Sequence, residues 1–286
     1  MSRVAYVNGA YVPHQRAMVH VEDRGYQFSD GIYEVCEVHD GHLVDESRHM
    51  ARLERSLNEL RIAQPMSQAA FGQVLRETLR RNRVRNGLIY IQVTRGVAPR
   101  DHGFPPLGTA PAVVVTAKSI DPRKGVAMAE RGISVITVPD NRWERVDIKT
   151  ISLLPNVLAK QAATEKGAGE AWFVDSDGSV TEGSSSNAWI VDQEGNLITR
   201  SADRGILRGI TRTVVIDLLA GQGLKLVERS FTIDEARAAR EAFVTSATKL
   251  VMPVVQIDDQ TIGDGRPGPV ALKLRELYHS LAEFTS

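Results

Sequence analysis

The sequence predicts an α+β fold with two domains. A chain of 286 residues is longer than one typical domain of roughly 100 to 200 residues. Strands and helices are expected along the whole chain, but they do not alternate strictly as they do in a doubly wound sheet. The Asp40-Gly41 pair lies between apolar runs. This is a hairpin signal, so antiparallel sheet is expected in the N-terminal half.

The N-terminal half is expected to combine this hairpin with two helices. Met50, Leu53, Leu57 and Leu60 recur at spacings of three and four residues, which predicts one apolar helix stripe. We expect strands over 32–38, 42–44, 88–94 and 112–117, and helices from about 45–47 and over 67–81. A charged segment with proline and glycine then predicts a linker over 119–124, between an N-terminal domain of residues 1–118 and a C-terminal domain of residues 125–286.

The C-terminal half is expected to be equally mixed. Helices are predicted over 155–166 and 210–220, with Gly221 just past the end of the second. Thr232 and Glu235 have the spacing of a capping box, and the last helix is expected after Pro269. The strands predicted in this half are 133–138, 171–174, 188–191, 241–245 and 254–257.

Composition excludes several classes of protein. Hydrophobic residues make up 42% and charged residues 24% of the chain, as is typical of globular and not of disordered proteins. Lys+Arg and Asp+Glu each number 35, so no overall positive charge favours nucleic acid. Apolar runs fall short of the ~20 residues that span a bilayer, and the single cysteine, Cys36, cannot form an internal disulfide. We therefore expect a cytoplasmic protein without a membrane or nucleic-acid partner.

Two motifs, one typical of dinucleotide binding and one of nucleic-acid binding, are better explained as ordinary structural features. The segment Gly263-Asp-Gly-Arg-Pro-Gly268 matches a dinucleotide fingerprint, but too few residues follow Gly268 to complete the ~30-residue βαβ unit, so a tight loop is expected. The arginine run over 76–85 lacks interleaved aromatic residues, so we expect a solvated helix face.

The histidines and the cysteine also favour structural roles. His39, His42 and His49 are expected around an exposed turn and not around a metal ion, because no Cys, Asp or Glu completes a standard ligand spacing. Cys36 is expected to be a packing residue, since no basic partner that would activate a thiolate is visible beside it.

Lys149 is a candidate for covalent chemistry. It lies between Ile148 and Ile151, whereas the other seven lysines lie in polar surroundings. Desolvation and a neighbouring cation can lower a lysine pKa from about 10.4 towards ~7 to 8, where a neutral amine can form a Schiff base. On local sequence alone, a surface lysine at the end of a strand is the alternative.

Two further segments could bind an anion or a charged ring. Glu182 begins a run of small donors in Thr181-Glu-Gly-Ser-Ser-Ser-Asn187, expected between two strands, although such runs are also typical of plain loops. Gly209-Ile-Thr211 begins a predicted helix, and Thr245-Ser-Ala-Thr248 ends a predicted strand. Free N–H groups at a helix N-terminus bind anions and nearby hydroxyls add donors, with simple capping as the alternative.

Together these segments resemble the class IV aminotransferases, the fold-type IV pyridoxal-phosphate enzymes. The matching residues are Asp147-Ile-Lys149, Asn156-Val-Leu-Ala-Lys-Gln161, the 181–187 segment and Leu207-Arg-Gly-Ile-Thr-Arg212. In family order, the resemblance extends from Tyr6-Val-Asn-Gly9 through Asp30-Gly-Ile-Tyr-Glu34 to the loop over 262–269. It implies a two-domain fold with the active site at the domain interface, and pyridoxal 5'-phosphate as cofactor.

The resemblance also implies roles for matching positions. Lys149 would hold the cofactor as a Schiff base and shuttle a proton, and Glu182 would pair with the protonated pyridine nitrogen. Leu207 would pack against the ring. Ala247 is a small departure, because a hydroxyl residue is common there, and its backbone amide would serve instead. The residues implied to bind the phosphate are Arg52, Ile210, Thr211, Ala247 and Thr248.

The substrate class depends on how the family holds a carboxylate. Arg100-Asp-His102 is similar to the Arg-x-His carboxylate trap of D-amino-acid aminotransferases, and Tyr33 would complete it. In those enzymes the pair reaches into the neighbouring subunit's site, so a homodimer is implied. The implied reaction converts D-alanine or similar D-amino acids and 2-oxoglutarate to pyruvate, or the matching oxo acid, and D-glutamate. The alternatives are branched-chain or (R)-amine transamination, aminodeoxychorismate lyase activity, or a non-catalytic binding protein.

Overall fold

Two compact units make up the chain in the computed structural model, which describes residues 3–220 and 223–286. The first unit consists of Met1–Pro122, Ile148–Ser152 and Glu283–Ser286, and the second of Arg123–Asp147 and Leu153–Ala282. Each unit has its own sheet and its own hydrophobic core. None of the helices over the described residues is long and apolar enough to cross a bilayer.

The first unit is built on a seven-stranded antiparallel sheet with the order β16-β4-β3-β5-β6-β1-β2. The predicted hairpin joins β3 to β4, and Asp40 and Gly41 have the positive φ angles, 49° and 90°, that a type I′ turn requires. Buried positions alternate along β3, so Glu34 faces the core and Tyr33 the opposite face. The strands are β1 (Val4–Val7), β2 (Ala10–Pro13), β3 (Gly31–His39), β4 (His42–Val44), β5 (Gly87–Thr94), β6 (Ala112–Ser119) and β16 (Phe284–Thr285).

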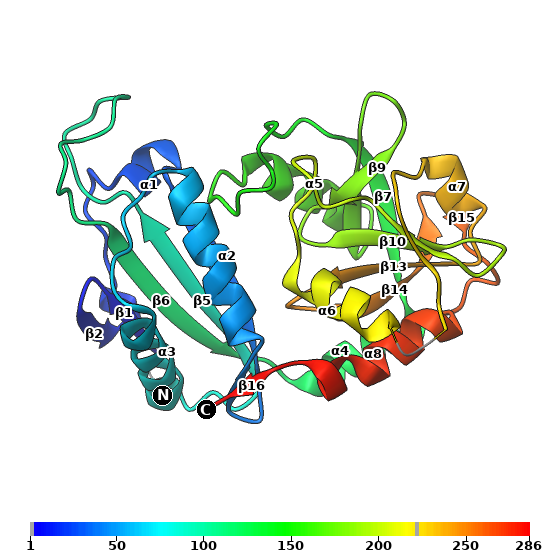
Figure 1. Ribbon diagram of the computed structural model, residues 1–286, viewed down its shortest axis with the longest axis horizontal. Helices are drawn as coiled ribbons and strands as arrows, with labels where there is room; N and C mark the ends of the chain where they lie inside the picture. The colour runs from blue at the N-terminus through cyan, green and yellow to red at the C-terminus, as the bar shows by residue number, and fades with distance from the viewer. Residues whose placement is uncertain (1–2, 221–222) are drawn as a thin grey trace. The chain divides into compact units, whose positions relative to one another are not determined.

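Two helices, α2 (Glu46–Glu59) and α3 (Gln68–Asn82), lie against one face of this sheet (Figure 1). Met50, Leu53 and Leu57 of the predicted stripe are buried in the core that α3 and the strands complete, and Leu60 packs against its edge. At ~1.5 to 3 kcal/mol for each fully buried side chain of this kind, the stripe fixes α2 on the sheet. The remaining elements are the short helix α1 (Arg24–Phe28) and the 3₁₀ helix η1 (His14–Arg16).

The second unit is built on a nine-stranded mixed sheet. Its main path is β12-β11-β10-β13-β14-β7-β8-β9, and β15 pairs with β14. The pairs β14–β7, β7–β8 and β11–β12 are parallel and the others are antiparallel. The strands are β7 (Ile133–Pro139), β8 (Glu170–Val174), β9 (Val180–Gly183), β10 (Asn187–Val191), β11 (Leu197–Thr199), β12 (Leu226–Glu228), β13 (Glu241–Ser246), β14 (Leu250–Ile257) and β15 (Gln260–Thr261).

Helices cover the sheet of the second unit. Helix α8 packs on β13 and β14, α6 packs on α8 and β13, and α5 packs on β7 and β8. Thr232 and Glu235 form the predicted capping box at the start of α7. The helices are α4 (Pro122–Arg131), α5 (Leu154–Glu165), α6 (Ile210–Leu219), α7 (Ile233–Arg237) and α8 (Pro269–Leu281).

The structure differs from the sequence-based division at three points. Helix α4 begins at Pro122 and takes up the end of the segment expected to be a linker, because proline is accommodated in the first turn of a helix. Packing assigns Ile148–Ser152, which includes Lys149, and Glu283–Ser286 to the first unit, although both segments lie within the range expected for the C-terminal domain. Thr181, Glu182 and Gly183 are part of a strand, β9. Gly221, expected after α6, lies outside the described residues.

Candidate active site

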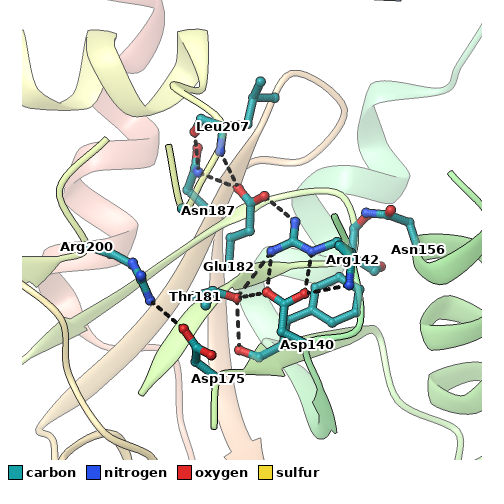
Figure 2. Close-up of polar contacts among 12 residues, drawn as sticks. Asp140, Arg142, Asn156, Asp175, Thr181, Glu182, Asn187, Arg200 and Leu207 are labelled. Carbon is teal, nitrogen blue, oxygen red and sulfur yellow. Dashed lines mark hydrogen bonds and ion pairs between the residues drawn. The ribbon is translucent and has the colours of Figure 1, made fainter. Parts of the chain in front are cut away.

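Glu182 is a buried carboxylate held at three points in the second unit. It lies on β9 with 7% of its side chain exposed. One carboxylate oxygen accepts hydrogen bonds from Asn187 Nδ2 and the Leu207 amide, both at 3.1 Å, and the other accepts one from Arg142 Nη1 (Figure 2). These three donors come from separate segments, so the orientation of the carboxylate is fixed.

Arg142, a residue not predicted from the sequence, is the charged partner of Glu182. Its guanidinium bonds to both Asp140 oxygens, at 2.9 and 2.7 Å, and lies 4.3 Å from the centre of the Phe173 ring. Burial alone would lower the pKa of Arg142, but its hydrogen bonds to Asp140 and the charge of Glu182 raise it. The Arg142 guanidinium therefore stays positively charged beside Glu182, and this charge stabilises the Glu182 carboxylate as an anion.

The N-terminus of α6 adjoins this cluster. Asn187 Nδ2 also donates to the Leu207 carbonyl at 2.8 Å, and a Cβ atom at Gly209 would overlap the Asn187 side chain. Gly209 is therefore needed for the close approach of this turn to β10. Glu182, Leu207 and the start of α6, with Ile210 and Thr211, thus form one connected group.

The first turn of α6 offers unused donors. The N-cap, Gly209, has no side chain to accept from the first amides, those of Ile210 and Thr211. Thr211 is 2% exposed, and over the described residues its hydroxyl makes no hydrogen bond. Amides and a hydroxyl at a helix N-terminus are suited to an anion such as a phosphate.

Ala247 and Thr248 lie in the turn that joins β13 to β14. The Thr248 hydroxyl is 3.2 Å from that of Ser246, and the Lys249 amide donates to the Ser246 hydroxyl at 3.2 Å. Helix α6 packs on β13, but among the described residues no hydrogen bond links this turn to Glu182 or to the first turn of α6. Thr211 and Thr248, both predicted to bind the phosphate, are therefore not hydrogen bonded to each other.

Lys149 lies in the segment of 148–152 that pairs with β3 in the first unit. The Tyr33 amide donates to the Lys149 carbonyl at 3.0 Å, and the Ile151 amide donates to the Gly31 carbonyl at 3.1 Å. The Lys149 ammonium lies 4.1 Å from the centre of the Tyr33 ring, a cation–π contact. The structure therefore brings together the predicted covalent lysine and the predicted substrate tyrosine.

Arg52 is held by the carboxylate of Glu34, a residue not predicted as part of the site. Glu34 accepts from Arg52 Nε at 2.7 Å and from Nη2 at 2.8 Å, and His49 Nδ1 is 2.7 Å from the same carboxylate. Burial alone would raise the pKa of Glu34, but the charge and hydrogen bonds of Arg52 and His49 lower it well below its usual range. The signal in the sequence was a glutamate at a core-facing position of an otherwise apolar strand face.

The prediction for His49 was wrong. This residue is 2% exposed on α2 and contacts Glu34, whereas an exposed turn was expected. The grouping of His49 with His39 and His42 relied on proximity in sequence, but a helix separates it from the hairpin. Cys36 is fully buried, as expected of a packing residue.

Arg100 and His102 lie on the exposed loop between β5 and β6. Both contact the ring of Phe28, Arg100 at 4.6 Å from the guanidinium carbon to the ring centre and His102 at 5.4 Å between ring centres. Among the described residues, neither has a hydrogen bond or ring contact with Tyr33. The loop therefore brings together two of the three predicted carboxylate ligands.

The glycine-rich segment 263–268 is a structural loop. It precedes α8, whose first amides, those of Val270 and Ala271, donate to the Glu241 carboxylate at 3.1 and 3.0 Å. A side chain at Gly268 would overlap Glu241. The anion position at this helix is thus filled by the protein, which agrees with the rejection of dinucleotide binding.

Comparison with known families decides the family. A model of the amino-transferase class IV family matches residues 31–257. This chain belongs to the class IV aminotransferases. The match covers most of the chain, including β3, the Lys149 segment, β9 and the start of α6.

Class IV aminotransferases of similar sequence extend over the same length. The D-alanine aminotransferase of Staphylococcus haemolyticus is 40% identical over 281 residues, which are 98% of this chain and 98% of the relative. The D-alanine aminotransferase of Bacillus licheniformis is 43% identical over 263 residues, which are 92% and 91% of the two chains.

Solved structures of class IV aminotransferases share the fold. The T.th. branched-chain amino acid aminotransferase with pyridoxamine 5'-phosphate has a TM-score of 0.88 at 28% identity, covering 98% of this chain and 94% of that chain. The branched-chain enzyme of Escherichia coli, at 24% identity and a TM-score of 0.88, covers 100% of this chain and 95% of that chain. The predicted α+β, fold-type IV class is confirmed.

Pyridoxal 5'-phosphate is the cofactor of this class IV aminotransferase. The residues of the chain fit its two charged parts. The uncapped start of α6, with the unbonded Thr211 hydroxyl, is suited to the phosphate. Glu182, anionic beside Arg142, is suited to a protonated ring nitrogen.

Proposed function

We propose that this class IV aminotransferase transfers the amino group of D-alanine, or of a similar D-amino acid, to 2-oxoglutarate, with pyruvate and D-glutamate as the products from D-alanine. The relatives named D-alanine aminotransferases support this proposal, because they match nearly the whole chain at 37–43% identity. The observation that carries it is the exposed loop on which Arg100 and His102 converge around Phe28. An arginine fork and an imidazole donor together can orient a substrate carboxylate.

The proposed chemistry combines one lysine with one carboxylate. When bound, pyridoxal 5'-phosphate supplies an electron sink for the charge left on the substrate Cα when its proton leaves. Lys149 Nζ is assigned to attach the cofactor and then to take and return that proton. Glu182 would hold a positive charge on the ring nitrogen of the bound cofactor, and Arg142 keeps Glu182 anionic and in place.

Cofactor binding is assigned to residues with separate roles. Leu207 is assigned to the face of the ring, next to Glu182, to which its amide donates. In the first unit, Arg52 would supply a guanidinium that Glu34 already orients. The residues assigned to the phosphate are Arg52, Ile210, Thr211, Ala247 and Thr248.

The substrate carboxylate is assigned to Tyr33, Arg100 and His102. Holding the carboxylate fixes which of the remaining Cα substituents faces Lys149. Only the hydrogen directed at the lysine is removed, so a trap on one side selects one enantiomer. Tyr33 contributes to this arrangement through its contact with the Lys149 ammonium.

A homodimer in the cytoplasm is part of the same proposal. Arg100 and His102 are exposed, and the loop that carries them also exposes Val97, Phe104 and Leu107. Apolar side chains that gather on an exposed loop are typical of subunit contacts. The free, buried thiol of Cys36 is compatible with a reducing compartment.

The test uses the purified holoenzyme and a panel of donors. We expect a yellow protein whose visible absorption is lost when D-alanine is added, with far slower reactions for L-alanine, L-leucine and (R)-1-phenylethylamine. Lys149→Ala should abolish turnover, because no other residue is assigned to the proton transfer. Lys166→Ala, at an exposed lysine, is the matched control and should behave like the parent.

Three outcomes would contradict the proposal. Turnover of D-alanine by Lys149→Ala at the parent rate would remove Lys149 from its assigned role. A parent enzyme that prefers L-leucine would indicate branched-chain transamination, and one that prefers (R)-1-phenylethylamine would indicate an amine transaminase.

A further inference from the structure

Asp30 connects two arginines at the base of the loop that carries Arg100 and His102. Its carboxylate accepts from Arg24 Nε at 2.8 Å and from Arg95 Nε and Nη2 at 2.7 and 2.9 Å. Burial alone would raise the pKa of Asp30, but the hydrogen bonds and charges of the two arginines lower it. Asp30 is therefore an anion that ties Arg24, the first residue of α1, to Arg95 at the beginning of this loop.

Arg24 extends from Asp30 to the main chain of the loop. Its side chain is 4% exposed. Nη1 donates to the Asp101 carbonyl at 2.6 Å, and Nη2 lies 3.5 Å from the His102 carbonyl. One guanidinium thus fixes the two peptide groups next to the Arg100 and His102 side chains, within the exposed stretch 99–104.

The Phe28 ring contacts the side chains of Arg24, Arg100 and His102. Its ring centre is 4.6 Å from the Arg100 guanidinium carbon, 4.8 Å from that of Arg24, and 5.4 Å from the His102 ring centre. A cation–π contact limits the directions that a long arginine side chain adopts without using its N–H donors. Arg100 can therefore be oriented by Phe28 and still offer its fork to a carboxylate.

We propose that Arg24 and Phe28 are positioning residues for the substrate carboxylate: Arg24 fixes the main chain of the loop, and Phe28 orients the side chains of Arg100 and His102. This inference rests on the proposed function, in which Arg100 and His102 bind the carboxylate. The alternative is that α1 and the loop pack together for stability alone. If Arg24 and Phe28 position the carboxylate site, their substitution should weaken substrate affinity and leave the limiting rate nearly unchanged. If they serve stability alone, affinity and limiting rate should fall together.

The experiment measures single turnovers of the holoenzyme with D-alanine at increasing concentration, followed by the loss of visible absorption. For Phe28→Leu and Arg24→Gln we expect the half-saturating concentration of D-alanine to rise about fivefold to thirtyfold. The limiting rate and the dissociation constant of pyridoxal 5'-phosphate should stay within about twofold, since neither residue is assigned to the cofactor.

Control variants separate positioning from folding. Phe28→Tyr keeps the ring and should retain the parent affinity for D-alanine. Arg80→Gln removes an exposed arginine that pairs with Glu77 and should change neither parameter. If Arg24→Gln does not fold, Arg24→Lys provides the measurement, because an ammonium cannot span both carbonyls and should raise the half-saturating concentration too.

Arg100→Ala in the same assay distinguishes two kinds of failure. If Arg100→Ala raises the half-saturating concentration but the Phe28 and Arg24 variants do not, the positioning role is wrong and the proposed function stands. If Arg100→Ala also leaves the concentration unchanged, the proposed carboxylate site is wrong and this inference fails with it. Equal losses of affinity and limiting rate in the α1 variants would support packing alone.

Discussion

At Arg142, one buried side chain sets the charge of the candidate site. It bonds to Asp140 and to Glu182 and is 5% exposed. Removing one partner of a buried ion pair leaves a charge without compensation, which costs far more than the pair contributes. Arg142 is assigned no contact with the cofactor or the substrate, so we expect it to affect the reaction only by keeping Glu182 anionic and in place.

A double-mutant cycle tests this dependence. Glu182→Gln should slow the single-turnover rate with D-alanine about 10- to 150-fold, since one ionic hydrogen bond of ~1.5 to 3 kcal/mol is lost in the transition state. Arg142→Gln should slow it less, and the double variant should be no slower than Glu182→Gln alone. Losses that multiply would show that Arg142 acts independently of Glu182.

Glu34 gives a prediction for the pH dependence of stability. Its pKa in the folded protein is lowered, so its contribution to stability is fully present above the unfolded value of about 4.3 and is lost as pH falls through the folded pKa. Glu34→Gln breaks a buried pair with Arg52 and should lower the free energy of unfolding by about 3 to 5 kcal/mol at neutral pH.

Urea unfolding from pH 7 down to pH 3 measures this effect. The difference between parent and Glu34→Gln should begin to shrink below about pH 4.3, because the parent carboxylate then starts to bind a proton in the unfolded state only. Glu77→Gln is the control, since Glu77 pairs with arginines on an exposed helix face. A difference that grows towards acidic pH would contradict the ionised pair.

At the scale of elements, two helices with the same kind of N-terminus have different tasks. Both α6 and α8 begin after a glycine that cannot cap the helix with a side chain, Gly209 and Gly268. In α8 the free amides bind Glu241 from β13, whereas no carboxylate of the described chain binds the Ile210 and Thr211 amides. The start of α8 therefore serves the fold, and the start of α6 is available to a phosphate.

A matched pair of variants tests this division. Glu241→Gln should lower the free energy of unfolding by about 0.5 to 2 kcal/mol and leave the affinity for pyridoxal 5'-phosphate unchanged. Thr211→Val should weaken cofactor binding about 2- to 10-fold and leave the stability of the cofactor-free protein nearly unchanged. Equilibrium unfolding measures the stability of each variant, and titration with pyridoxal 5'-phosphate measures its cofactor affinity. Loss of cofactor affinity in Glu241→Gln, or loss of stability alone in Thr211→Val, would contradict these roles.

At the scale of the whole molecule, the proposed homodimer predicts complementation between inactive chains. Lys149→Ala lacks the proposed proton-transfer amine, and Arg100→Ala lacks the guanidinium proposed to bind the substrate carboxylate. If Arg100 acts on the partner's site, a mixed dimer contains one site with both residues intact. An equal mixture unfolded and refolded together should regain about a quarter of the parent activity.

The controls are each variant refolded alone and the two mixed without unfolding, neither of which should regain activity beyond that of Arg100→Ala. No gain after joint refolding, with dimers confirmed by sedimentation, would mean that Arg100 acts within its own chain. A monomeric protein would rule out the dimer itself.

The sequence by itself determined the elements whose signals are local. The Asp40-Gly41 hairpin, the stripe on α2 and the capping box at Thr232 depend on residues a few positions apart, and all three are present. Motif order along the chain also indicated the family and the candidate residues Lys149 and Glu182. Short strands such as β2, β12 and β16 were not predicted, because two to four residues carry too little periodicity.

Only the tertiary structure decided the partners of the buried charges. Glu34 and Arg52 are 18 residues apart, Arg142 and Glu182 are 40 apart, and Glu241 and Val270 are 29 apart. Such pairs form because buried charges need compensation, and the partner is whichever charge or free N–H group the packing of strands and helices brings near. Local sequence carries no record of that proximity, so the residues that hold the candidate site in place became visible only in the folded chain.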